Sequence, residues 1–520
     1  MKTLIKICML LTVFFIHTSL FSQTIRIKNG LVKGTLENGV YVFKGIPFAL
    51  PPIDSLRWRS PQPVKNWTGV LKADKFAPAC PQANIAAFGF LDYGMSEDCL
   101  YLNIWKPDTI AENLPVIVWL HGGGFTLGST SQALTAGEEL AKNGVIVVSV
   151  AYRLGILGFL CLPELSEESE NNVSGNYGLL DQICALKWVQ ENISAFGGDS
   201  TNITLLGESA GSQSINILAA SPLAKGLFHK AIAMSGGTFL PASETKDRDC
   251  LLLLKSAENY GVEFMKRQGA NNLDELRKVD YKNFISDPDV SSGVLPPVID
   301  GYVIPADIYS IYEKAEYNDI PMIIGNTSGE GTIFILKDKP RKYEEATRQF
   351  YGSFADTLLK IYPKGNKKET LKSMANSFRD MYFGWFTYTW AQLQCKTGKS
   401  PVYVYYFNQL QPKSMITSFA KSQEPYHGSD CAYVFGHLEQ NPKIEYSEED
   451  KKLSKIMMAY IVNFAKNSNP NSVGLPEWSP YTLENQNTLY LNSEIQSGII
   501  PNIEKYKVID EYYSFKRNKD

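Results

Sequence analysis

The sequence predicts an α/β fold in which a mostly parallel sheet is flanked by helices. Apolar runs rich in β-branched residues recur along the 520-residue chain, and they show no alternation of apolar and polar positions. Such runs are typical of strands that are covered on both faces. Stretches with a helical spacing of apolar residues lie between them. Because strand and helix alternate, we expect one α/β core.

The predicted elements follow one another along the chain. The turn signals Asn29-Gly30 and Asn38-Gly39 indicate β-hairpins, and the proline-rich segment 47–63 indicates an irregular connection. A mostly helical insertion is expected over residues 247–300. The core strands are predicted at residues 116–120, 145–150, 203–206, 231–234, 321–324 and 402–407, and the core helices at residues 178–192, 209–220 and 453–464.

The N-terminal 22 residues predict a secretory signal peptide. Lys2 and Lys6 precede an apolar stretch over residues 7–16, and small or polar residues follow it up to Ser22. A membrane anchor is the alternative, but a span needs about 20 apolar residues and this stretch is shorter. No later segment is long and apolar enough to form a stable membrane span. We therefore expect a secreted or periplasmic protein with a single domain over residues 23–520.

The charge balance excludes one class of partner. The chain has 51 basic and 54 acidic residues, which gives a net charge of −3. A protein that binds nucleic acid usually has a basic excess or a basic patch. We therefore expect no nucleic-acid partner, whereas a small neutral substrate is compatible with this balance. The oligomeric state is unknown from the sequence.

A candidate nucleophile lies directly after a predicted strand. Gly207 to Gly211 form the pattern G-x-S-x-G around Ser209, between the strand 203–206 and a helical stretch. A strand, a sharp turn and a helix are the context that this motif requires. The glycines on either side of the serine allow the chain to fold tightly, and the helix N-terminus favours developing negative charge. The alternative is a Gly/Ser turn without chemical function.

A glycine loop follows another predicted strand. His121 is followed by three glycines, after the strand 116–120. Consecutive glycines let backbone N–H groups converge on one point, where they can stabilise the oxyanion of a tetrahedral intermediate. We expect these donors to be the N–H groups of Gly123, Gly124 and Ala210. The alternatives are a flexible turn and a phosphate loop, but a phosphate loop would end in Gly-Lys-Ser/Thr, which is absent here.

Two histidines are candidates for a general base. Both His427 and His437 come after Ser209 in the chain, and the loop that follows strand 402–407 favours His427. His229, between Phe228 and Lys230, is interpreted as structural.

The acid that orients the base should lie between the serine and the histidine. Glu330 follows the strand 321–324, at an end where open α/β sheets place functional groups. Asp300 is the second candidate, although its sequence is typical of a turn. Spacing alone does not distinguish Glu330 as the orienting acid from a solvated loop carboxylate.

Several longer motifs accompany these residues. They are FKGIPFA at residues 43–49, SEDCLYLNI at residues 96–104, NYGLLDQ at residues 176–182 and AFGGD at residues 195–199. Together with the Ser209 motif and the glycine loop, these motifs show that the sequence resembles the type B carboxylesterases, the carboxylesterase/cholinesterase group of α/β-hydrolases. The resemblance extends over nearly all of the mature chain.

The resemblance implies a serine esterase that acts on a small-molecule ester without a metal or other cofactor. It implies a catalytic triad of Ser209, Glu330 and His427, and the same oxyanion donors. It also implies that Glu208 and Ser235 lie near the site. Cys80 and Cys99 bracket a segment that a disulfide would close, and the resemblance implies this pairing.

The sequence departs from the cholinesterase pattern at one point. Cholinesterases carry a tryptophan between the two cysteines of this loop, and none lies between Cys80 and Cys99. Cation–π recognition favours tryptophan, so a choline ester is not expected.

An amidase or thioesterase with the same triad remains an alternative, as does a non-catalytic adhesion protein of the same group. Aromatic residues proposed for the pocket are Phe88, Phe90, Tyr93, Phe125, Phe239, Phe334 and Phe386.

Overall fold

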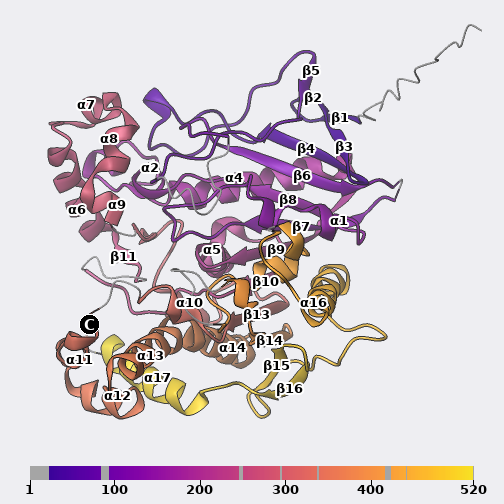
Figure 1. The fold of residues 1–520 in the computed structure, drawn as a ribbon. Coiled ribbons are helices and arrows are strands. Elements are labelled where there is room, and N and C mark those ends of the chain that lie inside the picture. Colours follow the sequence, from indigo (N-terminus) through magenta and orange to yellow (C-terminus); the bar gives the residue numbers. More distant parts are fainter. Residues whose placement is uncertain are drawn as a thin grey trace, which may run out of the picture.

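One large mixed sheet organises the chain in the computed structural model (Figure 1). The structure describes residues 23–83, 93–109, 111–244, 250–292, 295–335, 339–415, 423–440 and 442–518. Within these residues the sheet contains 11 strands. In spatial order they are β16 (Gln496–Ile499), β15 (Asn487–Leu491), β14 (Val402–Phe407), β13 (Met322–Thr327), β10 (Lys230–Met234), β9 (Gly198–Glu208), β7 (Leu114–Leu120), β8 (Ile146–Val150), β6 (Tyr101–Pro107), β4 (Val40–Pro47) and β3 (Thr35–Glu37).

The centre of the sheet is parallel and its two edges are antiparallel. Strands β8, β7, β9, β10, β13, β14 and β15 run in one direction. At the edges, β6, β4, β3 and β16 pair in antiparallel register with their neighbours. All six strands predicted from apolar runs lie in the parallel centre. The prediction of a mostly parallel sheet flanked by helices is therefore confirmed.

The two predicted hairpins are both present. Strand β1 (Thr24–Ile27) pairs with β2 (Gly30–Lys33), and β3 pairs with β4. At the second turn Asn38 and Gly39 have φ of 49° and 83°, the left-handed conformation that a two-residue hairpin turn of this type needs. Strand β5 (Val70–Lys72) joins β2 to complete a small three-stranded sheet at one end of the molecule.

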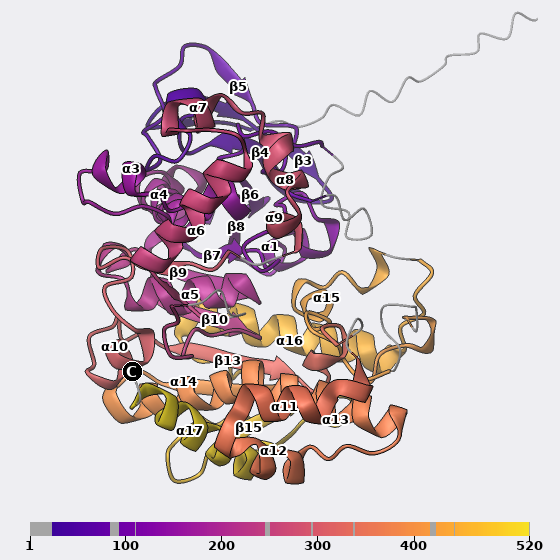
Figure 2. The same cartoon turned by 90° about the vertical axis from the view of Figure 1, so that its left-hand side faces the viewer.

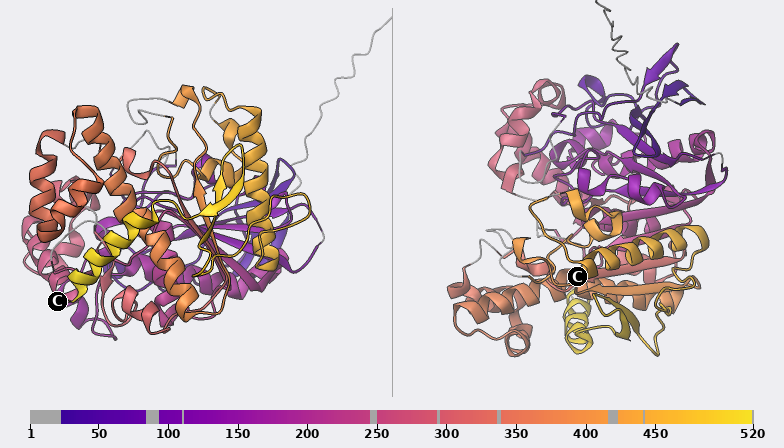
Figure 3. Two further views of the ribbon diagram at one scale, coloured as in Figure 1. Left: turned by 90° about the horizontal axis from the view of Figure 1, so that it is seen from below. Right: turned by 45° about the vertical axis from the view of Figure 1, so that its right-hand side comes forward.

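Each central strand contributes side chains to two cores. In β7, Val116 and Val118 pack on one face of the sheet, whereas Ile117 and Trp119 pack on the other. The first face is covered by α4 (Tyr177–Asn192), α5 (Ala210–Ala220) and α14 (Trp385–Thr397). The second is covered by α1 (Glu138–Ala141), α15 (Cys431–Phe435) and α16 (Glu448–Asn467), and Figure 3 shows α14 and α16 on opposite sides. Burial on both faces explains why the strands lack polar alternation.

Two groups of helices are added to this core (Figure 2). The predicted insertion at 247–300 contributes one group, together with the short strands β11 (Leu252–Leu253) and β12 (Val298–Ile299), and its described part is mostly helical as expected. It contains α6 (Leu254–Arg267), α7 (Leu273–Lys278), α8 (Tyr281–Ser286) and α9 (Pro288–Ser292). The second group contains α11 (Tyr343–Tyr351), α12 (Ala355–Ile361), α13 (Lys367–Arg379) and α17 (Ile503–Arg517). The remaining helices are α2 (Gly155–Phe159), α3 (Pro163–Glu167) and α10 (Ile308–Glu313).

The predicted disulfide is present between Cys80 and Cys99, with the two sulfurs 2.11 Å apart. Cys161, Cys184, Cys395 and Cys431 carry free thiols. The predicted signal peptide, residues 1–22, lies outside the described residues. Across the part of the chain that the structure describes, no helix combines the length and the apolar character needed to cross a membrane.

A buried ion pair joins the sheet to its first helical layer. The Arg153 guanidinium, just after β8, donates to Asp181 of α4 at 2.7 and 2.8 Å, and the two side chains are 3% and 0% exposed. Removing one partner leaves the other charge buried without compensation. We expect Asp181→Ala to lower the free energy of unfolding by about 3–5 kcal/mol, measured by chemical denaturation.

The matched control is Glu191→Ala, which removes the exposed pair between Glu191 and Lys28, 3.0 Å apart. Solvent screens such a pair, so a change below about 1 kcal/mol is expected. Equal effects of the two substitutions would contradict the assignment of Arg153–Asp181 as a structural pair.

Candidate active site

The candidate site lies at the carboxyl ends of the parallel strands. Ser209 follows β9, Ser235 follows β10, and Glu330 lies three residues after the end of β13. Backbone bonds hold these ends in register: Ser209 N–H donates to Met234 O at 2.9 Å, and Ser235 N–H donates to Gly325 O at 2.8 Å. Side chains that are distant in the sequence are thereby placed along one edge, where open α/β sheets form their sites.

Ser209 occupies a strained turn between β9 and α5. Its backbone has φ of 55° and ψ of −120°, which non-glycine residues rarely adopt. The turn leaves no space for side chains on either side: a Cβ at Gly207 would lie 2.6 Å from the backbone of Gly211, and a Cβ at Gly211 would lie 2.0 Å from Leu120 O. Helix α5 begins at the next residue, so its N-terminus faces the position of the serine.

The glycine loop passes directly beside this turn. A Cβ at Gly122 would lie 3.0 Å from Ser209 Cβ and 2.5 Å from Glu208 Oε2. Gly123 and Gly124 have φ of 110° and 61°, so both use the conformational freedom of glycine. The structure therefore brings together the predicted oxyanion loop and the predicted nucleophile.

Glu330 and His427 form a close pair. His427 Nδ1 lies 2.5 Å from Glu330 Oε2, and the Glu330 side chain is fully buried. The other carboxylate oxygen, Oε1, accepts hydrogen bonds from the Ser235 hydroxyl and the Thr327 N–H, both at 2.6 Å. These two donors fix the carboxylate and leave one oxygen for the imidazole. Ser235 thus contacts Glu330, which agrees with the prediction that Ser235 lies near the site.

Asp300, the second candidate for the acid, stabilises a turn. Its Oδ1 accepts the N–H groups of Tyr302, Val303 and Ile304, at 3.0, 2.9 and 2.9 Å. Its Oδ2 accepts from the Asn176 amide at 2.9 Å.

The second nitrogen of His427 faces Glu208. Nε2 lies 3.1 Å from Glu208 Oε1, and neither atom has a hydrogen-bond partner within the described residues. His427 Nε2 therefore makes no hydrogen bond to Ser209 Oγ. Glu208, immediately before Ser209, joins the serine turn to the imidazole.

The other described histidines have structural contacts. His437 Nε2 lies 2.9 Å from Ala136 O, and His229 Nδ1 accepts from Ile203 N–H at 3.1 Å. His121 is part of the glycine loop, and burial lowers its pKa to about 4. Among the described histidines, only His427 contacts a buried carboxylate pair.

The site concentrates negative charge around one imidazole. Burial raises the pKa of Glu208 to about 7, because the charged carboxylate is poorly solvated there. Burial opposes the charge on His427 as well, but the carboxylates of Glu208 and Glu330 outweigh it and raise its pKa to about 9. Burial also raises the pKa of Asp430 to about 7, and this carboxyl accepts the Tyr405 hydroxyl at 2.8 Å. Asp430 had no predicted role, because nothing in the sequence around it indicates that its side chain is buried.

Aromatic side chains pack on the His427 ring. The centroids of Phe334 and Phe383 lie 5.1 and 4.7 Å from that of the imidazole, and Phe378 stacks on Phe334 at 4.8 Å. Phe383 comes from a π-helical turn, Asp380–Gly384, between α13 and α14. Phe378 and Phe383 were missed by the sequence analysis, because only the fold brings this segment to the histidine.

The other aromatic residues proposed for the pocket have different positions. Phe125, Phe239 and Phe386 are buried in the core, and Phe125 packs against Phe159. Tyr93 is 48% exposed. Phe88 and Phe90 lie outside the described residues.

A serine turn at the carboxyl edge of a mixed sheet covered by helices on both faces is the arrangement of the α/β-hydrolases. Solved structures agree: a PNB esterase superposes with a TM-score of 0.80 and 34% identity, covering 94% of this chain and 99% of that one. The sequence profile described as "Carboxylesterase family" matches residues 22–509. The chain belongs to the carboxylesterase family and is a carboxylic ester hydrolase.

Curated relatives are similar over nearly their whole length. The para-nitrobenzyl esterase of Bacillus subtilis is 36% identical, over 93% of this chain and 97% of the relative. The fumonisin B1 esterase of Sphingopyxis macrogoltabida is 33% identical, over 91% and 86%. The human cocaine esterase is 32% identical, over 90% and 86%.

The charge around His427 gives a testable prediction. Glu208→Gln removes one of the carboxylates that favour the imidazolium, so the pKa of His427 should fall by about one to three pH units. It can be measured by NMR titration of histidine-labelled protein, with the His427 signal assigned by its loss in His427→Asn. Glu191→Gln, on the exposed surface, is the control and should leave the pKa unchanged. An unchanged pKa in Glu208→Gln would show that this carboxylate does not act on the imidazole.

Proposed function

We propose that this enzyme hydrolyses small-molecule esters through an acyl-enzyme on Ser209. The observation that supports the proposal most directly is the buried His427–Glu330 pair beside a strained serine turn. A nucleophile, a base and a group that orients the base are the parts that acyl transfer by serine requires.

In the proposed first half-reaction, His427 Nε2 accepts the proton of the Ser209 hydroxyl as Oγ attacks the ester carbonyl. Glu330 holds the imidazole with Nδ1 protonated and stabilises the imidazolium that forms. The tetrahedral intermediate then expels the alcohol, which takes the proton from His427. In the second half-reaction the same imidazole deprotonates a water molecule, which attacks the carbonyl carbon of the acyl-enzyme. The bond between this carbon and Ser209 Oγ then breaks, Oγ takes the proton from His427, and the carboxylic acid is released.

The oxyanion of both intermediates would be bound by backbone donors. The proposed donors are the N–H groups of Gly123, Gly124 and Ala210, and Ala210 begins the helix α5. Donors that are already oriented stabilise the charge without reorganisation, which is the largest contribution in many acyl-transfer enzymes.

Glu208 and Ser235 are proposed to tune this site rather than to react. Glu208 favours the imidazolium, and Ser235 fixes the acid that orients it. An imidazolium cannot accept the serine proton, so the value of kcat/KM should rise with pH as His427 loses its proton. Glu208→Gln should lower the pKa of His427. In this variant kcat/KM should therefore begin to rise at a more acidic pH than in the wild type.

We also propose that the enzyme is exported. The basic and apolar pattern of residues 1–22 supports a cleaved signal peptide, and the Cys80–Cys99 disulfide fits an oxidising compartment.

Replacement of the nucleophile tests the proposed mechanism. Ser209→Ala should abolish turnover of a p-nitrophenyl ester, because no other group can form the acyl-enzyme. An organophosphate should label Ser209 in the wild type, as located by peptide mapping. Ser212→Ala, one turn along α5, is the control and should retain activity and labelling. Substantial turnover by Ser209→Ala, or a label on another serine, would refute the proposal.

Export can be tested in a Gram-negative host that expresses the full chain. Protein recovered from the periplasm or medium should begin near Gln23, as read by N-terminal sequencing. An intact N-terminus on protein confined to the cytoplasm would contradict export.

A further inference from the structure

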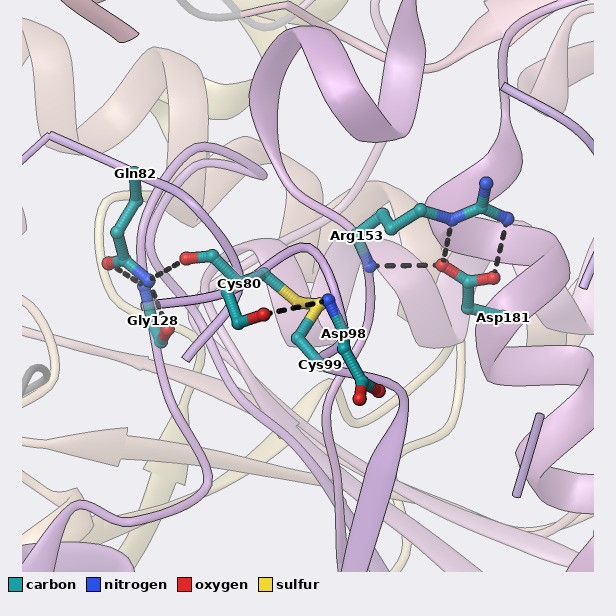
Figure 4. Close-up of a disulfide and its surroundings, with 8 residues drawn as sticks. Cys80, Gln82, Asp98, Cys99, Gly128, Arg153 and Asp181 are labelled. Carbon is teal, nitrogen blue, oxygen red and sulfur yellow. Dashed lines mark hydrogen bonds and ion pairs between the residues drawn. A yellow bond between two sulfur atoms is a disulfide. The ribbon is translucent and has the colours of Figure 1, made fainter. Parts of the chain in front are cut away.

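The glycine loop is followed by a segment that a buried glutamine holds in place. The Gln82 side chain is 2% exposed and pairs with the backbone of Gly128 through two hydrogen bonds. Its Nε2 donates to Gly128 O at 2.7 Å, while Gly128 N–H donates to its Oε1 at 2.9 Å. Nε2 also donates to Cys80 O at 3.0 Å, beside the disulfide (Figure 4). The Gln82 amide thus donates to and accepts from the backbone of the same residue, Gly128, as the backbone of a neighbouring β-strand would.

Gly128 in turn holds the His121 ring in place. It has φ of 128°, and a Cβ at this position would lie 2.0 Å from His121 Nδ1, so its backbone packs directly on the imidazole. His121 Nδ1 lies 2.9 Å from Gly122 O. A carbonyl can only accept, so Nδ1 carries the proton of this bond. Burial keeps the ring neutral by lowering its pKa to about 4.

A second set of bonds holds the next carbonyl of the loop. Gly123 O accepts the N–H groups of Thr126 and Leu127, at 3.1 and 3.0 Å, and the Thr126 hydroxyl at 3.2 Å. The donors to Gly123 O come from Thr126 and Leu127. Gly128, which Gln82 holds, follows Leu127 directly, so Gln82 also restrains the residues that bind Gly123 O.

Fixing these two carbonyls fixes the donors of the oxyanion hole. The peptide group is planar and trans, so its N–H points opposite to its carbonyl. The orientation of Gly122 O therefore determines where Gly123 N–H points, and that of Gly123 O determines where Gly124 N–H points. These are the two loop donors proposed above.

We propose that Gln82 is a positioning residue for the oxyanion hole, and that through it the Cys80–Cys99 disulfide supports the alignment of Gly123 and Gly124. This inference rests on the proposed function, since it assigns a role to the same loop. Within the described residues the Gln82 amide bonds to the backbones of Gly128 and Cys80 and not to Ser209, so it is proposed to act through Gly128. Its effect is therefore expected on the transition state rather than on the binding of substrate.

The test is the variant Gln82→Met, which removes both bonds to Gly128 at nearly constant volume. Gln394→Met is the matched control, because Gln394 is 1% exposed and its amide donates to Asp319 Oδ1 at 2.8 Å, beyond the opposite end of β13. Both variants are compared with the wild type for kcat and KM on p-nitrophenyl butyrate, and for inhibition by a trifluoromethyl ketone that forms a tetrahedral adduct with serine. Active sites are counted by organophosphate titration, so the values refer to folded enzyme.

Gln82→Met should lower kcat by about tenfold or more with little change in KM, since small misplacements of catalytic groups have effects of this size or larger. The oxyanion forms in both half-reactions, so kcat should fall whichever one limits the rate. The inhibitor should bind more weakly by a similar factor. Gln394→Met should leave kcat and inhibitor affinity per active site unchanged, even where its melting temperature falls.

Two results would overturn the inference. An unchanged kcat per active site in Gln82→Met would show that the bonds are only structural. A raised KM with unchanged kcat would show that Gln82 acts as a wall of the cavity that it lines with Leu127 and Ile156. If Ser209→Ala is inactive and Gln82→Met is normal, only this inference fails. Substantial turnover by Ser209→Ala would instead refute the proposed function.

The contribution of the disulfide is tested by combining substitutions. If Gln82 transmits its constraint, the double variant Cys80→Ala/Cys99→Ala should also lower kcat, and adding Gln82→Met should lower it by less than the product of the separate factors. If the factors by which kcat falls simply multiply, the disulfide and Gln82 act independently. That result would contradict the inference that the disulfide acts through Gln82.

Discussion

The parallel pairing of β9, β10 and β13 is the constraint on which the site depends. Two backbone hydrogen bonds, from Ser209 to Met234 and from Ser235 to Gly325, continue this pairing past the ends of the strands. The same register places Glu330 next to the hydroxyl of Ser235. Glu330 and the serine turn are therefore held by the sheet itself, whereas His427 lies between β14 and α15. The buried carboxylate compensates by fixing the imidazole at 2.5 Å.

The electrostatics of the site follow from burial. Glu208, Glu330 and Asp430 are three carboxyl groups in a region with little water, and one imidazole lies among them. Each carboxylate that keeps its charge stabilises a proton on His427. Burial raises the pKa values of Glu208 and Asp430, because their charged forms are poorly solvated. The pKa of the imidazole is raised for a different reason, since the neighbouring carboxylates outweigh the effect of its burial.

Much of the fold and part of the site were predictable from the sequence. Buried parallel strands need apolar residues at every position, so the six central strands were located, while the antiparallel edge strand β6 and the pair β15–β16 were not. Ser209 and the glycine loop were found because a tight turn and converging N–H groups require glycine locally. Phe383, Asp430 and Gln82 have no such requirement. Their positions depend on contacts between segments far apart in the sequence, which no local pattern records.

The aromatic side chains beside His427 come from a different part of the structure than the proposed nucleophile and acid. Ser209 and Glu330 are attached to strand ends, whereas Phe378 and Phe383 belong to the helical segment between β13 and β14. The dense contacts of Gly211 with Leu120 O leave the serine turn no freedom to vary. Among the described residues, the helical segment packs against the histidine through apolar rings, which tolerate exchange for others of similar volume. If these rings border the ester, as the proposed function implies, changes in substrate choice can accumulate in the added helices during evolution while the proposed catalytic groups stay the same.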